Sequence, residues 1–279
     1  MRRPRGDANT SRPWTQARVY SITALTALAL LTPLIVQPAK ALDTLTLYIS
    51  PSGTSNAVCS QTVPCDPQGA VDACPGGKTC MIKIADGVYE QKPVNITHHR
   101  SVFFTGNCND WDAVHFQLTD ASVPQFWVQD QSIGSFSCLK VSSATSGASA
   151  FSGRQHVTID LSNINFGTFV GGTHIALTEF SNATCGGSIK ITGGMNAHLN
   201  ENTFSSYNLY CTVDIPSPIA FSYFVIATNY ATLYANLATF TGGGAGNNSS
   251  GVRCMGSAAI IEKPKQEFPG NAENVPCQP

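Results

Sequence analysis

Charged residues are what this 279-residue sequence has least of. Asp, Glu, Lys and Arg together make up 12% of it, about half of the roughly 25% that is usual in soluble proteins. Gly, Asn, Ser and Thr take their place, and these residues stabilise turns and lower helix propensity. The composition therefore argues against a helical protein and favours a β-rich fold with many turns.

Long amphipathic helices are also missing. From Met81 onward the sequence alternates short strand patterns with turn signals, as in "SVFFTG", "HVTIDLSNINFG" and "SIKITGG". No long segment with the helical period of about 3.6 residues interrupts them. Many short strands with regular turns are typical of a sandwich, a barrel or a solenoid, so we expect an all-β fold.

The first 41 residues have the pattern of an export signal. Five arginines precede an apolar run at residues 22–36, and the small-residue site Ala39-Lys40-Ala41 follows it. The alternative is an uncleaved anchor, but the run is shorter than the roughly 20 residues that a spanning helix needs, and it contains Pro33. We therefore expect cleavage after Ala41, a secreted or periplasmic protein, and no stable membrane insertion of residues 42–279.

Loss of this segment would change the charge balance. It contains Lys40, five of the arginines and Asp7, so removing it would leave ten basic and sixteen acidic residues and a net charge near −6. Nucleic-acid binding depends on clustered Lys and Arg. We therefore expect no nucleic-acid partner.

All ten cysteines follow the expected signal. An even set in an exported chain predicts disulfides, and the close pairs Cys59/Cys65 and Cys74/Cys80 favour local bridges. Spacing alone does not give the other pairings. A zinc site is the alternative, but no C-x-x-C pair occurs and the histidines do not follow at finger spacing.

One short helix is predicted in "CDPQGAVDAC". Asp66 is a suitable N-cap, Pro67 suits the first helical position, and Pro-Gly-Gly at residues 75–77 would end the helix. Such a helix is too short to be stable alone in water. It must therefore pack its apolar face on a larger structure.

Internal repetition favours a solenoid among the all-β folds. Phe166, Phe204 and Phe240 end similar strand patterns at offsets of 38 and 36 in the sequence. Each offset suggests two coils of about 18 or about 19 residues. In a parallel β-solenoid, aligned apolar side chains fill the tube and aligned asparagines bond one coil to the next. Chance recurrence of Asn and Phe is the alternative. The recurring asparagines are Asn163, Asn165, Asn182, Asn200, Asn202 and Asn236.

The segment "LYISPSGTSNAVCSQTVPCDPQGAVDAC", followed by "IKIADGVYEQKPVNI", resembles the N-terminal part of secreted bacterial proteins of the pectate-lyase-like superfamily. The residues that carry the resemblance are Tyr48, Pro51, Gly53, Ala70, Ala73, Gly87 and Tyr89. It implies a right-handed parallel β-helix whose open end is capped by a short helix. We expect one domain at residues 42–279, with the cap at about 42–80, coils at about 81–260 and a C-terminal tail at about 261–279.

The resemblance also implies an extracellular polysaccharide as ligand, especially an acidic plant polymer, although a fold does not determine an activity. The enzyme motifs of the superfamily are incomplete here. In the turn that resembles that of methylesterases, Glu90 falls one position early and no paired aspartates follow. Residues 172–174 and 188–190 partly match two polygalacturonase motifs, but the sequence has no Asp-Asp pair. We therefore expect His174 and Lys190 to be ordinary coil residues, and we favour polysaccharide binding or an envelope role without catalysis.

A divergent polysaccharide lyase or glycoside hydrolase is the alternative function. Lyases of this superfamily use a basic residue to remove a proton and calcium to acidify it. Arg154, His156 and Asp160, at the entry to one strand pattern, are the catalytic candidates. Asp110 and Asp112 are candidates for holding calcium, unless they belong to a solvated turn. No other cofactor is expected.

Carbohydrate binding requires exposed aromatic side chains beside polar groups. Trp111, between the two aspartates, and Trp127 are the candidates for stacking on a sugar, although about half of such aromatics should lie in the core of a tube with alternating strands. The spacing of Glu179 and Glu201 in the sequence is a plausible coil length, so these two carboxylates could stack on one outer face.

Overall fold

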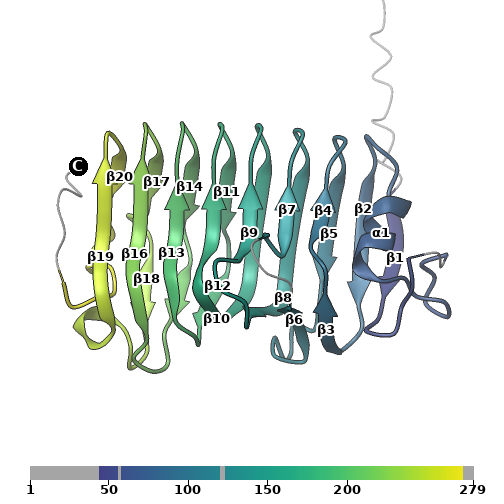
Figure 1. The fold of residues 1–279 in the computed structure, drawn as a ribbon, viewed down its shortest axis with the longest axis horizontal. Helices are drawn as coiled ribbons and strands as arrows, with labels where there is room; N and C mark the ends of the chain where they lie inside the picture. The colour runs from purple at the N-terminus through teal and green to yellow at the C-terminus, as the bar shows by residue number, and fades with distance from the viewer. Residues whose placement is uncertain (1–43, 56–57, 120–122, 273–279) are drawn as a thin grey trace, which may run out of the picture. The chain divides into compact units, whose positions relative to one another are not determined.

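The structure is a computed structural model that describes residues 44–55, 58–119 and 123–272. The expected export signal lies outside these residues. Strands, with one short helix and one turn of 3-10 helix, wind into a parallel β-solenoid of about seven turns (Figure 1). This confirms the predicted all-β solenoid. None of the helices in the described part of the chain has the length and apolar character of a membrane span.

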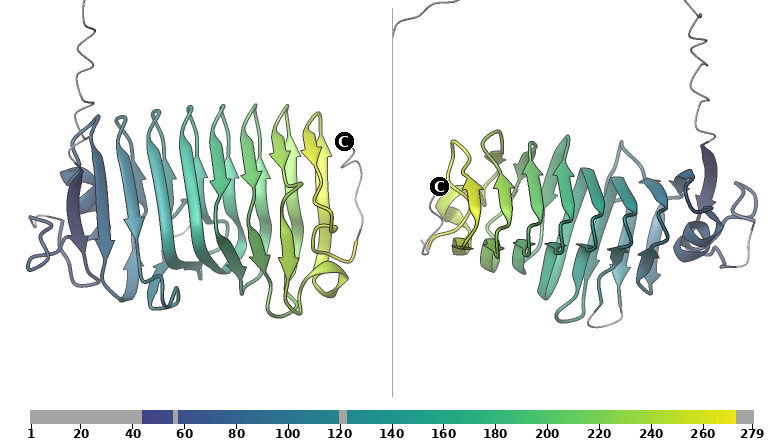
Figure 2. Two further views of the ribbon diagram at one scale, coloured as in Figure 1. Left: turned by 180° about the vertical axis from the view of Figure 1, so that it is seen from behind. Right: turned by 90° about the horizontal axis from the view of Figure 1, so that it is seen from above.

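Equivalent strands of successive coils pair in parallel and form three rows, which we call faces 1, 2 and 3 (Figures 1 and 2). Face 1 contains β1 (Leu45–Ile49), β2 (Thr79–Ile84), β5 (Ser101–Thr105), the first parts of β8 (Ile133–Ser143) and β10 (Thr158–Leu177), β11 (Asn182–Cys185), β14 (Ser206–Leu209), β17 (Thr232–Tyr234) and β20 (Ile260–Glu262). Face 2 contains β3 (Gly87–Gln91), β6 (Val114–Leu118), later parts of β8 and β10, β12 (Ser188–Ile191), β15 (Thr212–Asp214) and β18 (Thr239–Thr241). Face 3 contains β4 (Val94–Ile96), β7 (Phe126–Val128), β9 (Ser149–Gly153), the end of β10, β13 (Met195–Glu201), β16 (Ala220–Thr228) and β19 (Ser250–Ser257).

The coil is longer than the repeat of phenylalanines predicts. Ile159 pairs with Ala183, and Ala183 with Tyr207, so one coil takes about 24 residues here. The shorter coil length is wrong because the three phenylalanines occupy different places in the coil. Phe166 is fully buried in β10, whereas Phe204 is 51% exposed at a turn.

The core of the solenoid consists of columns of aligned side chains. On face 1 the strand Ser101–Thr105 alternates buried and half-buried residues, so that every second side chain points into the tube. Phe104 stacks on Phe136 with ring centroids 5.4 Å apart, and Phe126 on face 3 stacks on Phe151 at 5.4 Å. Such aligned burial of apolar area is the main stabilising term of the fold.

Asparagines bond neighbouring coils, as expected. Asn229 Nδ2 donates to Asn202 Oδ1 at 2.6 Å, the backbone N of Ser188 donates to Asn163 Oδ1 at 3.3 Å, and Asn182 accepts from the hydroxyl of Ser206. These bonds link side chains or backbone groups one coil apart.

The helix α1 (Pro67–Ala73) follows β1 and contacts β1 and β4. Asp66 caps it by accepting a hydrogen bond from the backbone N of Gly69 at 2.6 Å, which supplies one of the partners that a helix N-terminus lacks. The Gln68 side chain reaches β4, where its Oε1 accepts from the backbone N of Asn95 at 2.7 Å. The helix therefore packs on the solenoid, as expected for a helix that is too short to be stable alone in water.

Disulfides join the coils and their connecting loops. Cys59–Cys65 and Cys74–Cys80 confirm the two predicted local bridges. Two long-range bridges, Cys108–Cys138 and Cys185–Cys211, could not be assigned from spacing. Cys254 is disulfide-bonded as well.

The C-terminal coil is covered by the segment that follows β20. Phe268 is 3% exposed, and its ring lies 6.1 Å from Phe224 and 6.0 Å from Phe240. Gln266 Oε1 accepts from the backbone N of Phe240 at 2.8 Å, and the backbone N of Arg253 donates to the carbonyl of Ala272 at 3.1 Å. These contacts occupy edge groups that could otherwise pair with another chain.

We expect Phe268→Ala to lower the free energy of unfolding by about 3 kcal/mol, because it opens a cavity at the end of the core. Urea unfolding followed by far-ultraviolet circular dichroism would measure this loss. Leu237→Ala is the control, since Leu237 is 67% exposed and its truncation should change stability by less than about 0.5 kcal/mol. Equal effects of the two substitutions would show that Phe268 does not close the core.

Candidate functional site

A groove on face 2, beneath the loop at residues 107–113, combines polar groups with an aromatic wall. This groove has a volume of about 380 Å³. We call it the Trp111 groove. Its lining residues are Asn109, Asp110, Trp111, Asp112, Asn165, Ser188, Ile189, Lys190, Thr212 and Asp214.

Several bonds fix the loop that forms the wall of the groove. Cys108 is bonded to Cys138 at the start of the face 2 part of β8. Asn107 Nδ2 donates to the Asp86 carboxylate at 3.1 and 3.3 Å. Within the loop, the backbone N of Asp112 donates to Asp110 Oδ1 at 3.0 Å. The half-buried Trp111 is therefore held between anchored neighbours.

Asp112 connects the loop to the strands. Its Oδ1 lies 3.0 Å from Lys140 Nζ and accepts from Asn165 Nδ2 at 2.7 Å. Burial alone would raise the pKa of Asp112, but the hydrogen bond and positive charge of Lys140, the Asn165 amide and the charge of Lys190 outweigh it and leave the pKa below its ordinary value. Asp112 is thus an ionised group that already has an ammonium and an amide as partners.

The floor of the groove belongs to one column of face 2, of which Asn165, Lys190 and Asp214 line the groove. The register aligns His115, Lys140, Asn165, Lys190 and Asp214, one residue from each coil. Lys190 Nζ has no described carboxylate within 4.0 Å. The column therefore presents the ammonium of Lys190 beside the carboxylate of Asp214, whereas the amide of Asn165 is buried and bonded to Asp112 and Thr192.

Two hydrogen bonds order the same column. Asn165 Oδ1 accepts from Thr192 Oγ1 at 2.9 Å, and Asp214 Oδ1 accepts from Thr241 Oγ1 at 3.1 Å. Further along, His115 Nε2 lies 2.7 Å from Ser142 Oγ. Burial and the charge of Lys140 lower the pKa of His115 despite the opposing effect of Asp112, so this imidazole is neutral at pH 7.

The sequence prediction placed Asp110, Trp111 and Asp112 in one candidate site, and all three line the groove. It missed Lys140, Asn165 and the role of Lys190. The equal spacing of these three positions is visible in the sequence, but it has meaning only once the coil length is known. Among the described residues, no group of three or more His, Cys, Asp or Glu side chains has the geometry of a metal site.

Trp127, the second aromatic candidate, lies elsewhere. It belongs to β7 on face 3, where it pairs with Asn95 and Ser152 in the neighbouring coils. The side chain is half-buried, and its Nε1 has no hydrogen-bond partner in the described part of the protein. Trp127 is thus not part of the Trp111 groove.

The proposed catalytic trio is divided between different surfaces. Arg154 forms an ion pair with Glu179 at 3.5 Å, and the ring of His156 stacks on Phe180 at a corner of the coil. Asp160 lies on face 1, where it accepts from Ser135 Oγ at 3.1 Å. The three side chains line no shared pocket among those described.

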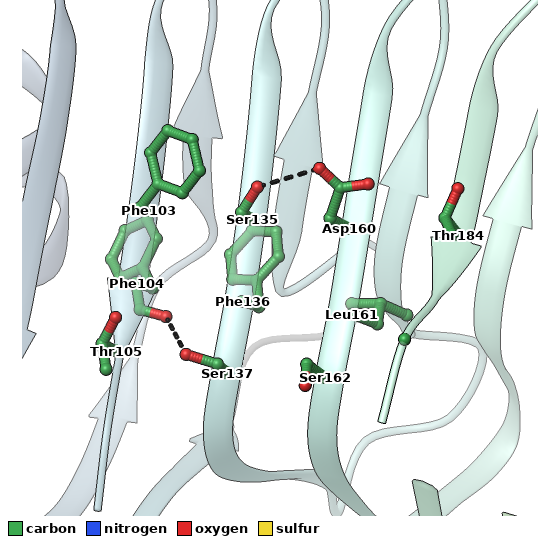
Figure 3. Close-up of a pocket in the computed structure, with 11 residues that line it drawn as sticks. Phe103, Phe104, Thr105, Ser135, Phe136, Ser137, Asp160, Leu161, Ser162 and Thr184 are labelled. Carbon is green, nitrogen blue, oxygen red and sulfur yellow. Dashed lines mark hydrogen bonds between the residues drawn. The ribbon is translucent and has the colours of Figure 1, made fainter. Parts of the chain in front are cut away.

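Asp160 lines a shallow pocket of about 330 Å³ on face 1 (Figure 3). Its polar lining consists mainly of the hydroxyls of Thr105, Ser135, Ser137, Ser162 and Thr184. Figure 3 shows Phe103 beside these hydroxyls, and the hydrogen bonds from Ser135 to Asp160 and from Ser137 to the Phe104 carbonyl. This surface has a single carboxylate and no cation, which gives it fewer groups for orienting a ligand than the Trp111 groove has.

Glu179 and Glu201 do not stack on an outer face, so that expectation is wrong. Glu201 pairs with Leu177 and Ala227 in the adjacent coils and is fully buried. Glu179 lies at a turn between strands. Their spacing in the sequence is therefore not a coil length.

The tube contains a second group of polar side chains around His174 and His198. Their Nδ1 atoms are 3.0 Å apart, and His174 Nε2 lies 3.2 Å from the carbonyl oxygen of Gly167. Because a carbonyl only accepts, His174 carries its proton on Nε2, and His198 Nδ1 donates to His174 Nδ1. His198 Nε2 is then an acceptor without a partner among the described residues.

Burial controls the ionisation of this interior group. It lowers the pKa of His198 to about 3, and burial together with the charge of His198 lowers that of His174. Burial also raises the pKa of Glu201, whose carboxylate oxygens have no partner in the described part of the chain, and burial and Glu201 raise the pKa of Tyr207. These side chains are at most 1% exposed, so they affect stability rather than contact a substrate.

Comparison with protein-family models, with curated proteins and with solved structures gives no match for this chain. The Trp111 groove is the described surface that combines an aromatic wall, a hydrogen-bonding floor and a rigid frame.

The interior groups predict a stability maximum near pH 6.5. Below their ordinary pKa of 6.5, His174 and His198 bind protons in the unfolded chain but not in the folded one, so stability falls as the pH falls. Above its ordinary pKa of 4.5, Glu201 keeps its proton only in the folded chain, so stability falls as the pH rises. Between pH 4.5 and pH 6.5 the unfolded chain binds two protons on the histidines and the folded chain binds one on Glu201, so stability still rises with pH. Above pH 6.5 the histidines are neutral in both states, and only the effect of Glu201 remains.

We expect Glu201→Gln to remove the decline above pH 6.5, which amounts to about 1.4 kcal/mol per pH unit until Glu201 ionises. Urea unfolding at a series of pH values would measure it. Glu90→Gln is the matched control, because Glu90 is exposed in β3. The same pH slope in Glu201→Gln and in the unaltered protein would contradict the assignment.

Proposed function

We propose that this is an exported carbohydrate-binding protein that holds a neutral polysaccharide in the Trp111 groove without cleaving it. The observation that carries the proposal is the position of Trp111. A loop anchored by Cys108–Cys138 holds the indole beside polar side chains of face 2.

Sugar chemistry matches this combination. A sugar ring has apolar C–H faces that pack on an aromatic ring and hydroxyls that hydrogen-bond to carboxylates, amides and ammonium groups. Lys190 and Asp214 supply one such group from each of two adjacent coils, about 4.8 Å apart, and Asp110 adds a carboxylate from the loop. The disulfide and the bonds of Asp112 fix the groove before a ligand arrives, which lowers the entropic cost of binding.

The charges of the lining favour a neutral polymer over an acidic one. Asp110, Asp112 and Asp214 face the single ammonium of Lys190. Lys140, at the margin, neutralises Asp112, which leaves two carboxylates against one ammonium. A uronate polymer would be repelled unless a cation such as calcium bridged it to the carboxylates.

The ionisation of the groove supports binding rather than hydrolysis. A general acid near neutral pH needs a raised pKa, whereas the pKa of Asp112 is lowered. Its carboxylate is engaged by Lys140 and Asn165, so it is not placed to donate a proton to a glycosidic oxygen.

We also propose that the protein is exported and that its architecture is that of the pectate-lyase-like superfamily. Disulfides are typical of oxidising compartments outside the cytosol, which supports an export signal at residues 1–41. We take the solenoid to be right-handed and pectate-lyase-like. We also take α1 to cover the first coil, because Cys74–Cys80 and the Gln68–Asn95 bonds tie it to β2 and β4.

We expect the purified protein to be retarded by a neutral polysaccharide in affinity electrophoresis. A panel of soluble xylan, glucomannan, mixed-linkage glucan and polygalacturonate, with and without calcium, would test this. Trp111→Ala should weaken retention at least about ten-fold, or about 1.4 kcal/mol. Trp127→Ala is the control, because Trp127 lies on face 3.

Three results would contradict the proposal. Retention of none of the polymers would exclude binding to this class, and retention of polygalacturonate alone with calcium would show a cation-bridged acidic ligand. Release of reducing ends or of unsaturated products would show the enzyme alternative.

A further inference from the structure

The corner between faces 3 and 1 repeats one unusual turn in every central coil. Each turn has two consecutive residues with positive φ, so both are in the left-handed region. The pairs are His98/His99, Asp130/Gln131, Gln155/His156, Glu179/Phe180, Thr203/Phe204 and Asn229/Tyr230. The turns form a row along one edge of the solenoid in Figure 1. The backbone N of the second residue donates to the carbonyl of the first residue in the next coil, as from His156 to Glu179 at 3.1 Å.

The second residues of these turns form an exposed ladder of stacked rings. His156, Phe180, Phe204 and Tyr230 follow one another with ring centroids 5.1 Å apart at each step and interplanar angles of 8°, 3° and 10°. Phe180, Phe204 and Tyr230 are 49%, 51% and 65% exposed. Because each ring covers the faces of its neighbours, an interior ring of the ladder presents only its edge to solvent.

The ladder is interrupted at Gln131. His99, Gln131 and His156 occupy its equivalent positions in three successive coils, since the backbone N of His99 donates to the Asp130 carbonyl at 3.3 Å and that of Gln131 donates to the Gln155 carbonyl at 3.1 Å. His99 and His156 are therefore two coil spacings apart, about 10 Å. A pocket of about 430 Å³ lies here, lined by His98, His99, Asp130, Gln131, Gln155 and His156.

The pocket exposes a ring face that is covered elsewhere in the ladder. One face of the His156 imidazole is covered by Phe180, and the other is on the Gln131 side. A ring placed midway between His99 and His156 would be about 5 Å from each, which equals the 5.1 Å step of the ladder itself. A pyranose ring has apolar C–H faces that pack on aromatic rings, so it suits a position between two imidazoles.

We infer that this pocket, which we call the Gln131 slot, is a second carbohydrate site that takes one pyranose ring of a neutral saccharide between His99 and His156. The Asp130 carboxylate and the amides of Gln131 and Gln155 provide hydrogen-bond partners for its hydroxyls. This inference rests on the proposed function, because it gives the same class of ligand a second point of attachment.

Gln131→Phe tests the slot, because it places a ring in the gap and extends the stack from His156. The variant should melt at or above the temperature of the unaltered protein, since stacked aromatic pairs stabilise by about 0.5–1.5 kcal/mol. Leu237→Phe is the control, because it adds an exposed ring outside both candidate sites. Isothermal titration calorimetry with xylotetraose, cellotetraose and mannotetraose would count the sites.

We expect two binding sites in the unaltered protein and in Leu237→Phe, one in Gln131→Phe, one in Trp111→Ala and none in the double variant that combines Trp111→Ala with Gln131→Phe. One site that Trp111→Ala removes and Gln131→Phe leaves intact would overturn the slot but keep the proposed function. One site with the opposite behaviour would keep the slot and overturn the Trp111 groove. No binding of any of the three tetrasaccharides would overturn both.

Discussion

Backbone hydrogen bonding between successive coils, in a fixed parallel register, is the interaction on which the rest of this structure depends. It places Ile159, Ala183 and Tyr207 one above another in the core, and the same register aligns Lys140, Asn165 and Lys190 on the outside. Side chains of the strands therefore contact partners in adjacent coils, a whole coil length away in sequence. A shift of one residue would exchange inner and outer side chains, so the apolar columns hold the polar columns in place.

The register also explains why chemically different residues meet. The low-dielectric tube keeps Glu201 and the two histidines neutral, and the neutral rings of His174 and His198 stack on Phe166 and Phe224. On the outside of the tube, the same alignment forms ion pairs and ring stacks between residues that are far apart in sequence. Asp112 is the clearest case, because its partners come from β8 and β10 rather than from its own loop.

Local features of the fold could be predicted from the sequence, whereas features that depend on coil length could not. Alternation in strands such as "SVFFT", the cap at Asp66 and the bridge Cys74–Cys80 depend on residues close in sequence. The coil length estimated from the phenylalanines is too short because Phe204 lies in a turn, and the sequences of turns and of strand ends are similar at all three corners. Arg154 and Asp160 are close in sequence, but the corner between β9 and β10 sends them to different faces. Lys140 and Asn165 belong to the candidate site through register alone.

Both candidate binding surfaces occur where the repeat is broken. In regular coils the side chains of one coil cover those of the next, so the interior of the ring ladder offers a ligand only edges. The loop at residues 107–113 adds a wall that the other coils lack within the described residues, and Gln131 stands where its neighbours His99 and His156 supply a ring. Each irregularity exposes a face that the regular pattern would cover, while the coils on both sides keep its position fixed. A solenoid can therefore gain a binding site through one substitution or one longer loop without any change in its core.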